Sequence, residues 1–282
     1  MLPAYLFISS GILAAITGFF TGAFTDLSRL WILPASYAGF FLVQLAGFFV
    51  FLWLYSLTID TSKPQEKESK FCRFLTKRAV EVVVPLLMKI HTTGTENIPK
   101  NGRFLLVSNH LFDLDPAVFL RCFPKSQLVF VSKQENQKLF LVGKYMHKLI
   151  CPLINRENDR EALKTILRCI QILKDDMASV VVFPEGYIHK NDRKLHHFRS
   201  GVFKIAMRSN VPIVVCTLQN TQYLKANIRR LKRTHVYMDL LQVIEPEQYQ
   251  GMTTVDLANQ IYNTMAQHLG PENVSTEERI TI

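Results

Sequence analysis

Two long uncharged apolar runs open the chain, over residues 2–25 and 30–58. Each run exceeds the roughly 20 residues that a helix needs to cross about 30 Å of hydrocarbon. A water-soluble domain rarely needs two such runs back to back, so a buried globular hairpin is the less favoured alternative. The pattern predicts a transmembrane helical hairpin over residues 1–60.

From residue 89 onward, short β-branched and aromatic runs alternate with longer amphipathic stretches. This alternation is typical of βα units and predicts an α/β fold, with a largely parallel or mixed sheet and flanking helices. Strands are predicted at 90–95, 104–108, 128–132, 180–183, 213–217 and 235–244, and helices at 159–174, 202–207 and 254–269. The helix at 159–174 is preceded by Asn158, with Glu161 at the spacing of a capping box.

Residues 61–88, between the hairpin and the body, are first basic and then apolar. Two interpretations of this segment stay open. It is either an amphipathic helix on an anionic membrane surface or the first core element of the body. The predicted division is therefore a hairpin at 1–60, a juxtamembrane segment at 61–88 and an α/β domain at 89–282.

Charge is distributed unevenly along the chain. Residues 1–60 contain only three charged side chains, Asp26, Arg29 and Asp60, whereas the whole chain has a formal net charge of +10. Lysines and arginines crowd just after the second apolar run, which predicts a multi-pass protein of the cell (inner) membrane with its body in the cytoplasm. The five cysteines include no CxxC pair, which favours a reducing compartment.

The basic body favours an acidic partner. Nucleic acid is disfavoured because the sequence has no zinc spacing, no helix-turn-helix signal and no RNP-like strand. The segment 225–233 contains five basic side chains, Lys225, Arg229, Arg230, Lys232 and Arg233. They are candidates for contact with anionic membrane lipid or an acidic acyl carrier protein, and a solvated face is the alternative.

Candidate chemistry lies where predicted strands end, because ligands of open α/β sheets bind there. The strand at 104–108 runs into His110, and Asp115 follows with Pro116, which reads as a helix N-cap and a first-turn proline. A turn here brings His110 and Asp115 together. A carboxylate that accepts one ring N–H makes the other imidazole nitrogen a general base. Since the chain has no GxSxG elbow, the pair predicts direct attack by a substrate hydroxyl.

Spacing alone makes this pair a weak signal, and three further blocks make it specific. In order, the blocks are Asn109-His110-x4-Asp115, Leu153-Ile154-Asn155-Arg156, Phe183-Pro184-Glu185-Gly186 and Val211-Pro212-Ile213-Val214-Val215. Together they resemble the motif blocks of the 1-acylglycerol-3-phosphate acyltransferase family, and the likeness spans roughly residues 89–220. The resemblance implies that His110 is the general base, that Asp115 orients it, and that Arg156, Glu185 and Gly186 bind the glycerol phosphate.

The chain also departs from that family's pattern. The third block is often followed by Thr-Arg, whereas this chain has Tyr187 and Ile188. A basic residue that would bind phosphate at this position is therefore absent. Three later residues, Arg193, Lys194 and Arg199, stay open as substitutes.

The resemblance implies transfer of a fatty acyl group from acyl-CoA or acyl-carrier protein to the sn-2 hydroxyl of lysophosphatidate, giving phosphatidic acid. No cofactor and no metal is expected, and His189, His196 and His197 lack the spacing of a zinc site. Backbone N–H groups near residues 116–118 or Gly186 are expected to stabilise the oxyanion. Glycerol 3-phosphate or another lysophospholipid stays open as the acceptor, and a non-catalytic lipid-binding membrane adaptor stays open as another class of function.

Overall fold

The computed structural model of the chain describes residues 2–155 and 158–275. Its body is built on a six-stranded sheet with the order β1-β8-β7-β2-β6-β3. Adjacent strands are parallel except for β7 and β8, which are antiparallel. The described strands are β1 (Met88–Thr93), β2 (Leu105–Ser108), β3 (Leu128–Phe130), β4 (Ser132–Lys133), β5 (Leu153–Ile154), β6 (Ser179–Val182), β7 (Ile213–Gln219) and β8 (Thr234–Ile244). The predicted α/β class with a largely parallel, mixed sheet is confirmed.

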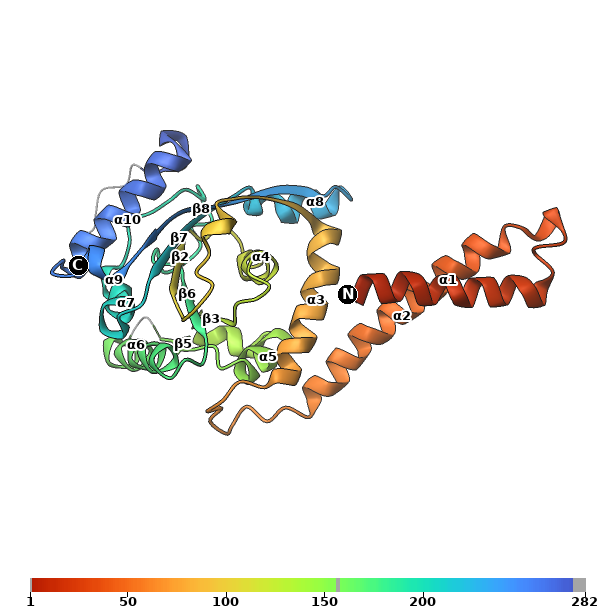
Figure 1. Ribbon diagram of the computed structural model, residues 1–282, viewed down its shortest axis with the longest axis horizontal. Coiled ribbons are helices and arrows are strands. Elements are labelled where there is room, and N and C mark those ends of the chain that lie inside the picture. The colour runs from red at the N-terminus through yellow and green to blue at the C-terminus, as the bar shows by residue number, and fades with distance from the viewer. Residues whose placement is uncertain (1, 156–157, 276–282) are drawn as a thin grey trace.

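Helices cover both faces of this sheet. The described α-helices are α1 (Leu2–Thr21), α2 (Ile32–Leu57), α3 (Lys70–Leu87), α4 (Asp115–Cys122), α5 (Val142–Lys148), α6 (Asp159–Lys174), α7 (Lys204–Ser209), α8 (Leu224–Arg229), α9 (Pro246–Tyr249) and α10 (Thr254–Leu269). Short 3₁₀ turns include η3 (Gln134–Lys138), η4 (Ser200–Phe203) and η5 (Thr221–Tyr223). In Figure 1, α3 and α4 lie on the side of the sheet toward the hairpin, and α7 and α10 lie on the opposite side. The central strands are buried on both faces, which explains their continuous apolar sequence.

The first two helices form a hairpin that projects from the body (Figure 1). Both are long and apolar enough to cross a membrane by length and composition. The first helix ends at Thr21, four residues before the apolar run ends, because Gly22 takes a left-handed conformation with φ of 70°. The Ala23 N–H then donates to the Gly18 carbonyl at 2.9 Å, the bond of a glycine C-cap. Polar contacts between the helices come from Gln44, which hydrogen-bonds Ser9 and Ser10.

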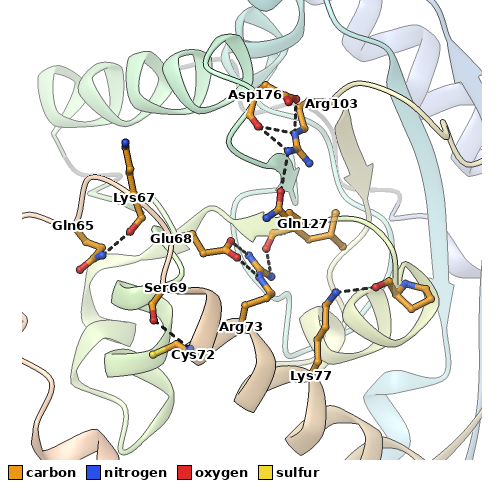
Figure 2. Close-up of polar contacts among 12 residues, drawn as sticks. Gln65, Lys67, Glu68, Ser69, Cys72, Arg73, Lys77, Arg103, Gln127 and Asp176 are labelled. Atoms are coloured by element: carbon orange, nitrogen blue, oxygen red, sulfur yellow. Dashed lines mark hydrogen bonds and ion pairs between the residues drawn. The ribbon is translucent and has the colours of Figure 1, made fainter. Parts of the chain in front are cut away.

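The segment at 61–88 contains α3, which packs on the body through one face. Arg73, only 5% exposed, pairs with the Glu68 carboxylate and donates to the Leu128 carbonyl at 2.8 Å (Figure 2). Lys77 donates to the Pro124 carbonyl at 2.8 Å. On its other face α3 exposes Phe71 and Phe74. The same helix therefore has the packing of a core element and the exposed apolar face expected at a membrane surface.

Several local predictions can be compared with the helices directly. The helices predicted at 159–174 and 254–269 have those bounds, whereas the one predicted at 202–207 is split into η4 and α7. The Asn158 side chain caps α6 by accepting the N–H groups of Arg160 and Glu161. The capping-box prediction for Glu161 is wrong, because its carboxylate accepts instead from the Asn155 amide at 2.8 Å.

Candidate active site

The carboxyl ends of β2, β6 and β7 meet at one edge of the sheet because these strands run parallel. Asn109 follows β2 directly and is buried. Its Nδ2 donates to the Leu218 carbonyl at 2.9 Å, and its Oδ1 accepts the Leu218 N–H at 2.7 Å. These two bonds fasten the start of the loop that carries His110 to β7. The sequence showed Asn109 only as part of the first block, and its position after a buried strand was the available signal for this role.

The structure brings His110 and Asp115 together. His110 Nδ1 lies 2.9 Å from Asp115 Oδ2, and the same oxygen accepts the N–H groups of Leu111 at 2.7 Å and Phe112 at 3.0 Å. An oxygen that accepts two backbone N–H groups is a carboxylate acceptor, so the His110 Nδ1 carries the proton that it donates. The His110 Nε2 is then the basic nitrogen. Because the His110 side chain is 17% exposed and Asp115 is fully buried, the imidazole is the reachable member of the pair.

The predicted role of Asp115 as the helix N-cap is wrong. The N-cap position of α4 is Leu114, and Asp115 is the first residue of the helix, with Pro116 in the first turn. The Asp115 carboxylate turns back to the preceding loop, where three donors converge on its Oδ2. Its Oδ1 is buried and has no hydrogen-bond partner in the described part of the chain. The side chain thus organises the His110 loop instead of capping the helix.

Phe183 forms one wall beside the histidine. Its ring stacks on the His110 imidazole with centroids 4.1 Å apart and planes 14° apart. The stack and the Asp115 hydrogen bond together fix the orientation of the imidazole ring. Phe183 also lines a cavity of about 150 Å³ between α6 and η4. The sequence contained Phe183 as the first residue of the third block, but its contact with His110 required the strand order to be known.

Glu185 connects the first and third blocks. One carboxyl oxygen accepts the His110 N–H at 2.9 Å, and the other accepts the His196 N–H at 3.1 Å. The side chain is buried, and burial raises the pKa of Glu185 to about 8, although the two backbone donors oppose the shift. Both oxygens are thus engaged with the backbone. This geometry indicates that Glu185 holds the His110 loop and the His196 loop together, and it disfavours direct contact between Glu185 and the acceptor substrate.

Gly186 takes a left-handed conformation with φ of 92°, which side chains other than glycine rarely adopt. Its N–H donates to the Phe183 carbonyl at 3.0 Å, and the Ala117 N–H donates to the Leu114 carbonyl at 3.0 Å. Two of the backbone donors expected near residues 116–118 and Gly186 to stabilise an oxyanion are therefore already occupied, and Pro116 has no N–H. Arg156, the other predicted phosphate ligand, lies outside the described residues.

Other groups that carry chemistry lie apart from this pair. All five cysteines are free thiols, and burial raises the pKa of Cys151 to about 11 and that of Cys169 to about 12. His189 stacks on His196 with ring centroids 3.2 Å apart, and the His196 Nε2 lies 2.9 Å from the Asp192 Oδ1. Within the described ranges, no group of three or more His, Cys, Asp or Glu side chains is placed to hold a metal ion.

The described sheet carries a His–Asp pair at its strand ends. Comparison with known families identifies the class of protein to which this arrangement belongs. The Acyltransferase family model matches residues 89–219, a range that contains all of the described site residues. The crystal structure of the 1-acyl-sn-glycerophosphate acyltransferase PlsC from Thermotoga maritima shares the fold, with a TM-score of 0.58 at 19% identity. The alignment covers 81% of this chain and 89% of that one. The protein is an O-acyltransferase.

Sequence relatives identify the family within the acyltransferases. The probable 1-acyl-sn-glycerol-3-phosphate acyltransferase of Mycoplasma pneumoniae is 30% identical over 192 residues, which cover 64% of this chain and 71% of the relative. The 1-acyl-sn-glycerol-3-phosphate acyltransferase of Borreliella burgdorferi is 28% identical over 135 residues, which cover 48% of this chain and 52% of the relative. The chain belongs to the 1-acylglycerol-3-phosphate acyltransferase family.

Proposed function

We propose that this protein transfers a fatty acyl group from an acyl thioester to the sn-2 hydroxyl of 1-acylglycerol 3-phosphate, giving phosphatidic acid. The observation that carries the proposal is the His110–Asp115 pair at the strand ends of a chain in this family. The named activity of the relatives supports the acceptor. Acyl-CoA and acyl-carrier protein are the two candidate donors.

In the proposed mechanism His110 is the general base. Its Nε2 takes the proton from the sn-2 hydroxyl as that oxygen attacks the thioester carbonyl, and Asp115 stabilises the imidazolium that forms. The attack forms the new C–O bond of a tetrahedral intermediate, which collapses by re-forming the carbonyl and breaking the C–S bond, and the thiolate receives the proton from His110. A thiolate is a good leaving group, so the transfer needs no covalent enzyme intermediate.

The hairpin gives this chemistry a location. Lysolipid and product both partition into a bilayer, and α1 and α2 would hold the body against one. The body would then face the cytoplasm at a cell membrane, as the lysines and arginines after α2 indicate. The exposed Phe71 and Phe74 of α3 would lie at the interface.

A basic knob, formed by residues 225–233, supports contact with anionic lipid. It comprises α8 after its first residue and the turn before β8, and it contains five basic and no acidic side chains. Leu231 projects from this turn and is 96% exposed. Figure 1 shows α8 on the side of the body from which the hairpin extends. An apolar side chain surrounded by cations suits a surface of acidic headgroups over acyl chains.

The test measures thiol release by the purified full-length protein, with acyl-CoA or acyl-carrier protein as donor. The acceptors are 1-acylglycerol 3-phosphate, glycerol 3-phosphate, lysophosphatidylcholine and none. We expect release that depends on 1-acylglycerol 3-phosphate and falls about 10²- to 10⁴-fold in His110→Ala and in Asp115→Asn. The exposed His235→Ala and Asp113→Asn are the matched controls and should retain activity.

Each other outcome contradicts a stated part of the proposal. Release without acceptor would indicate a hydrolase, and preference for glycerol 3-phosphate or lysophosphatidylcholine would replace the acceptor. A folded His110→Ala variant with full activity would remove the general base from the mechanism.

A further inference from the structure

The basic residue absent after the third block leaves the acceptor phosphate without an evident ligand there. Of the three substitutes that the sequence leaves open, Arg193 is engaged elsewhere. Its Nη1 donates to the Leu111 carbonyl at 3.1 Å and lies 3.5 Å from the Gln222 carbonyl. Arg193 therefore braces the loop that follows His110. Of the three candidates, only Arg199 lines the cavity beside Phe183.

At Arg199 the chain comes back into contact with the third block, residues 183–186. The Arg199 N–H donates to the Pro184 carbonyl at 2.9 Å, which places residue 199 beside Gly186 across the intervening loop. A Cβ at Gly186 would lie only 3.0 Å from Arg199 Nε and 3.3 Å from Arg199 Cδ. The guanidinium thus occupies the space that the missing side chain leaves. Gly186 is required for its left-handed φ and also for this close approach.

The cavity walls are mostly apolar, and Arg199 is their basic member. The apolar walls include Val131, Ile166, Val182 and Phe183. Asp159 is the carboxylate among the lining residues, and no ion pair joins it to Arg199 in the described part of the chain. Phe183 lines this cavity together with Arg199, and the Phe183 ring stacks on the His110 imidazole, so Phe183 links the cavity to the proposed base.

We propose that Arg199 binds the phosphate of the acceptor and that Gly186 serves to seat its guanidinium. A guanidinium offers a planar fork of N–H donors that matches two phosphate oxygens. The phosphate would then lie on the far side of Phe183 from His110, with the glycerol carbons spanning the distance to Nε2. This inference rests on the proposed function, because it assigns the phosphate-binding residue of that reaction.

The experiment compares two acceptors that differ only in the phosphate, 1-acylglycerol 3-phosphate and 1-acylglycerol. In Arg199→Ala we expect kcat/KM for the phosphate-bearing acceptor to fall about 10- to 100-fold, chiefly through KM, because a charge-assisted hydrogen bond is lost. For 1-acylglycerol, followed at higher enzyme concentration, kcat/KM should change less than about twofold. Arg199→Lys keeps the charge without the fork and should fall in between. Arg208→Ala, an exposed arginine of α7, is the control.

The outcomes separate this inference from the proposed function. If the wild-type protein does not use 1-acylglycerol 3-phosphate, the proposed function fails. If the wild-type protein does use 1-acylglycerol 3-phosphate, the assignment of Arg199 is wrong when Arg199→Ala retains the wild-type KM. It is also wrong when the variant loses kcat/KM equally for both acceptors. Gly186→Ala, checked for retained folding by its melting temperature, should reproduce the selective loss, and an unchanged KM in that variant would remove Gly186 from the assignment.

Discussion

At the scale of single residues, Glu185 is a carboxyl group held where water cannot solvate its charge. Burial raises its pKa to about 8, and the nearby carboxylates of Asp115 and Asp192 act in the same direction. Glu185 therefore stays protonated in the folded protein at pH values at which the same side chain is already ionised in the unfolded chain. Because the folded-state pKa is the higher one, the contribution of Glu185 to stability is fully present below its unfolded-state pKa and is lost as pH rises toward 8.

The expected result is a melting temperature that falls more steeply between about pH 5 and pH 8 in the wild type than in Glu185→Gln, since a shift of this size corresponds to several kcal/mol at most. The glutamine cannot ionise, and its NH₂ group also cannot accept the second backbone N–H, so its melting temperature should be lower at pH 5. Scanning calorimetry of both proteins in one detergent across this range measures the difference. Parallel pH profiles would show that Glu185 does not carry the shift.

At the scale of elements, α3 is anchored by a buried ion pair. Arg73 and Glu68 have side chains only 7% and 9% exposed, and the arginine also donates to the carbonyl of Leu128, the first residue of β3 (Figure 2). Removing one partner leaves the other charge buried and unpaired, which typically costs about 3–5 kcal/mol. Arg73→Ala should therefore lower the free energy of unfolding by about that amount.

Two variants control for helix propensity and for net charge. Lys70→Ala changes an exposed lysine of the same helix and should have little effect. Arg73→Met combined with Glu68→Gln leaves no charge unpaired and should be more stable than Arg73→Ala. Denaturant unfolding in detergent compares the four proteins, and equal stability of Arg73→Ala and Lys70→Ala would show that the pair does not anchor α3.

Arg73 also shows what the sequence could and could not predict. Hydrophobic periodicity located α6 and α10 and the central strands, because each pattern is local and each element buries one face or both. Arg73, in contrast, reads as one of several juxtamembrane cations, and its partner carbonyl lies 55 residues away in sequence. In the site, His110 and Asp115 were predictable because a short turn joins them. The Glu185 brace and the Arg199–Gly186 contact depend on loops that converge only after the sheet forms.

At the scale of the whole molecule, the hairpin and the basic knob lie toward the same side of the body (Figure 1). If the hairpin inserts into a bilayer, the knob faces its surface, and each cation near an anionic surface contributes about 1 kcal/mol at low salt. The hairpin already fixes the protein to the membrane, so we expect the knob to orient the body. The simultaneous change of Arg229, Arg230 and Lys232 to Ala should lower acyl transfer in anionic vesicles to the rate in zwitterionic ones. The rate in detergent should stay the same.

The position of Leu231 can be measured directly. The chain has two tryptophans, Trp31 and Trp53, both in the hairpin. With both changed to Phe, Leu231→Trp should be quenched by brominated acyl chains in anionic nanodiscs. Val255→Trp, on α10 at the opposite side of the molecule, should not be quenched. If Leu231→Trp stays unquenched and the triple variant loses activity only with acyl-carrier protein as donor, the knob binds the acidic carrier. In that case the orientation of the body must come from the hairpin and α3 alone.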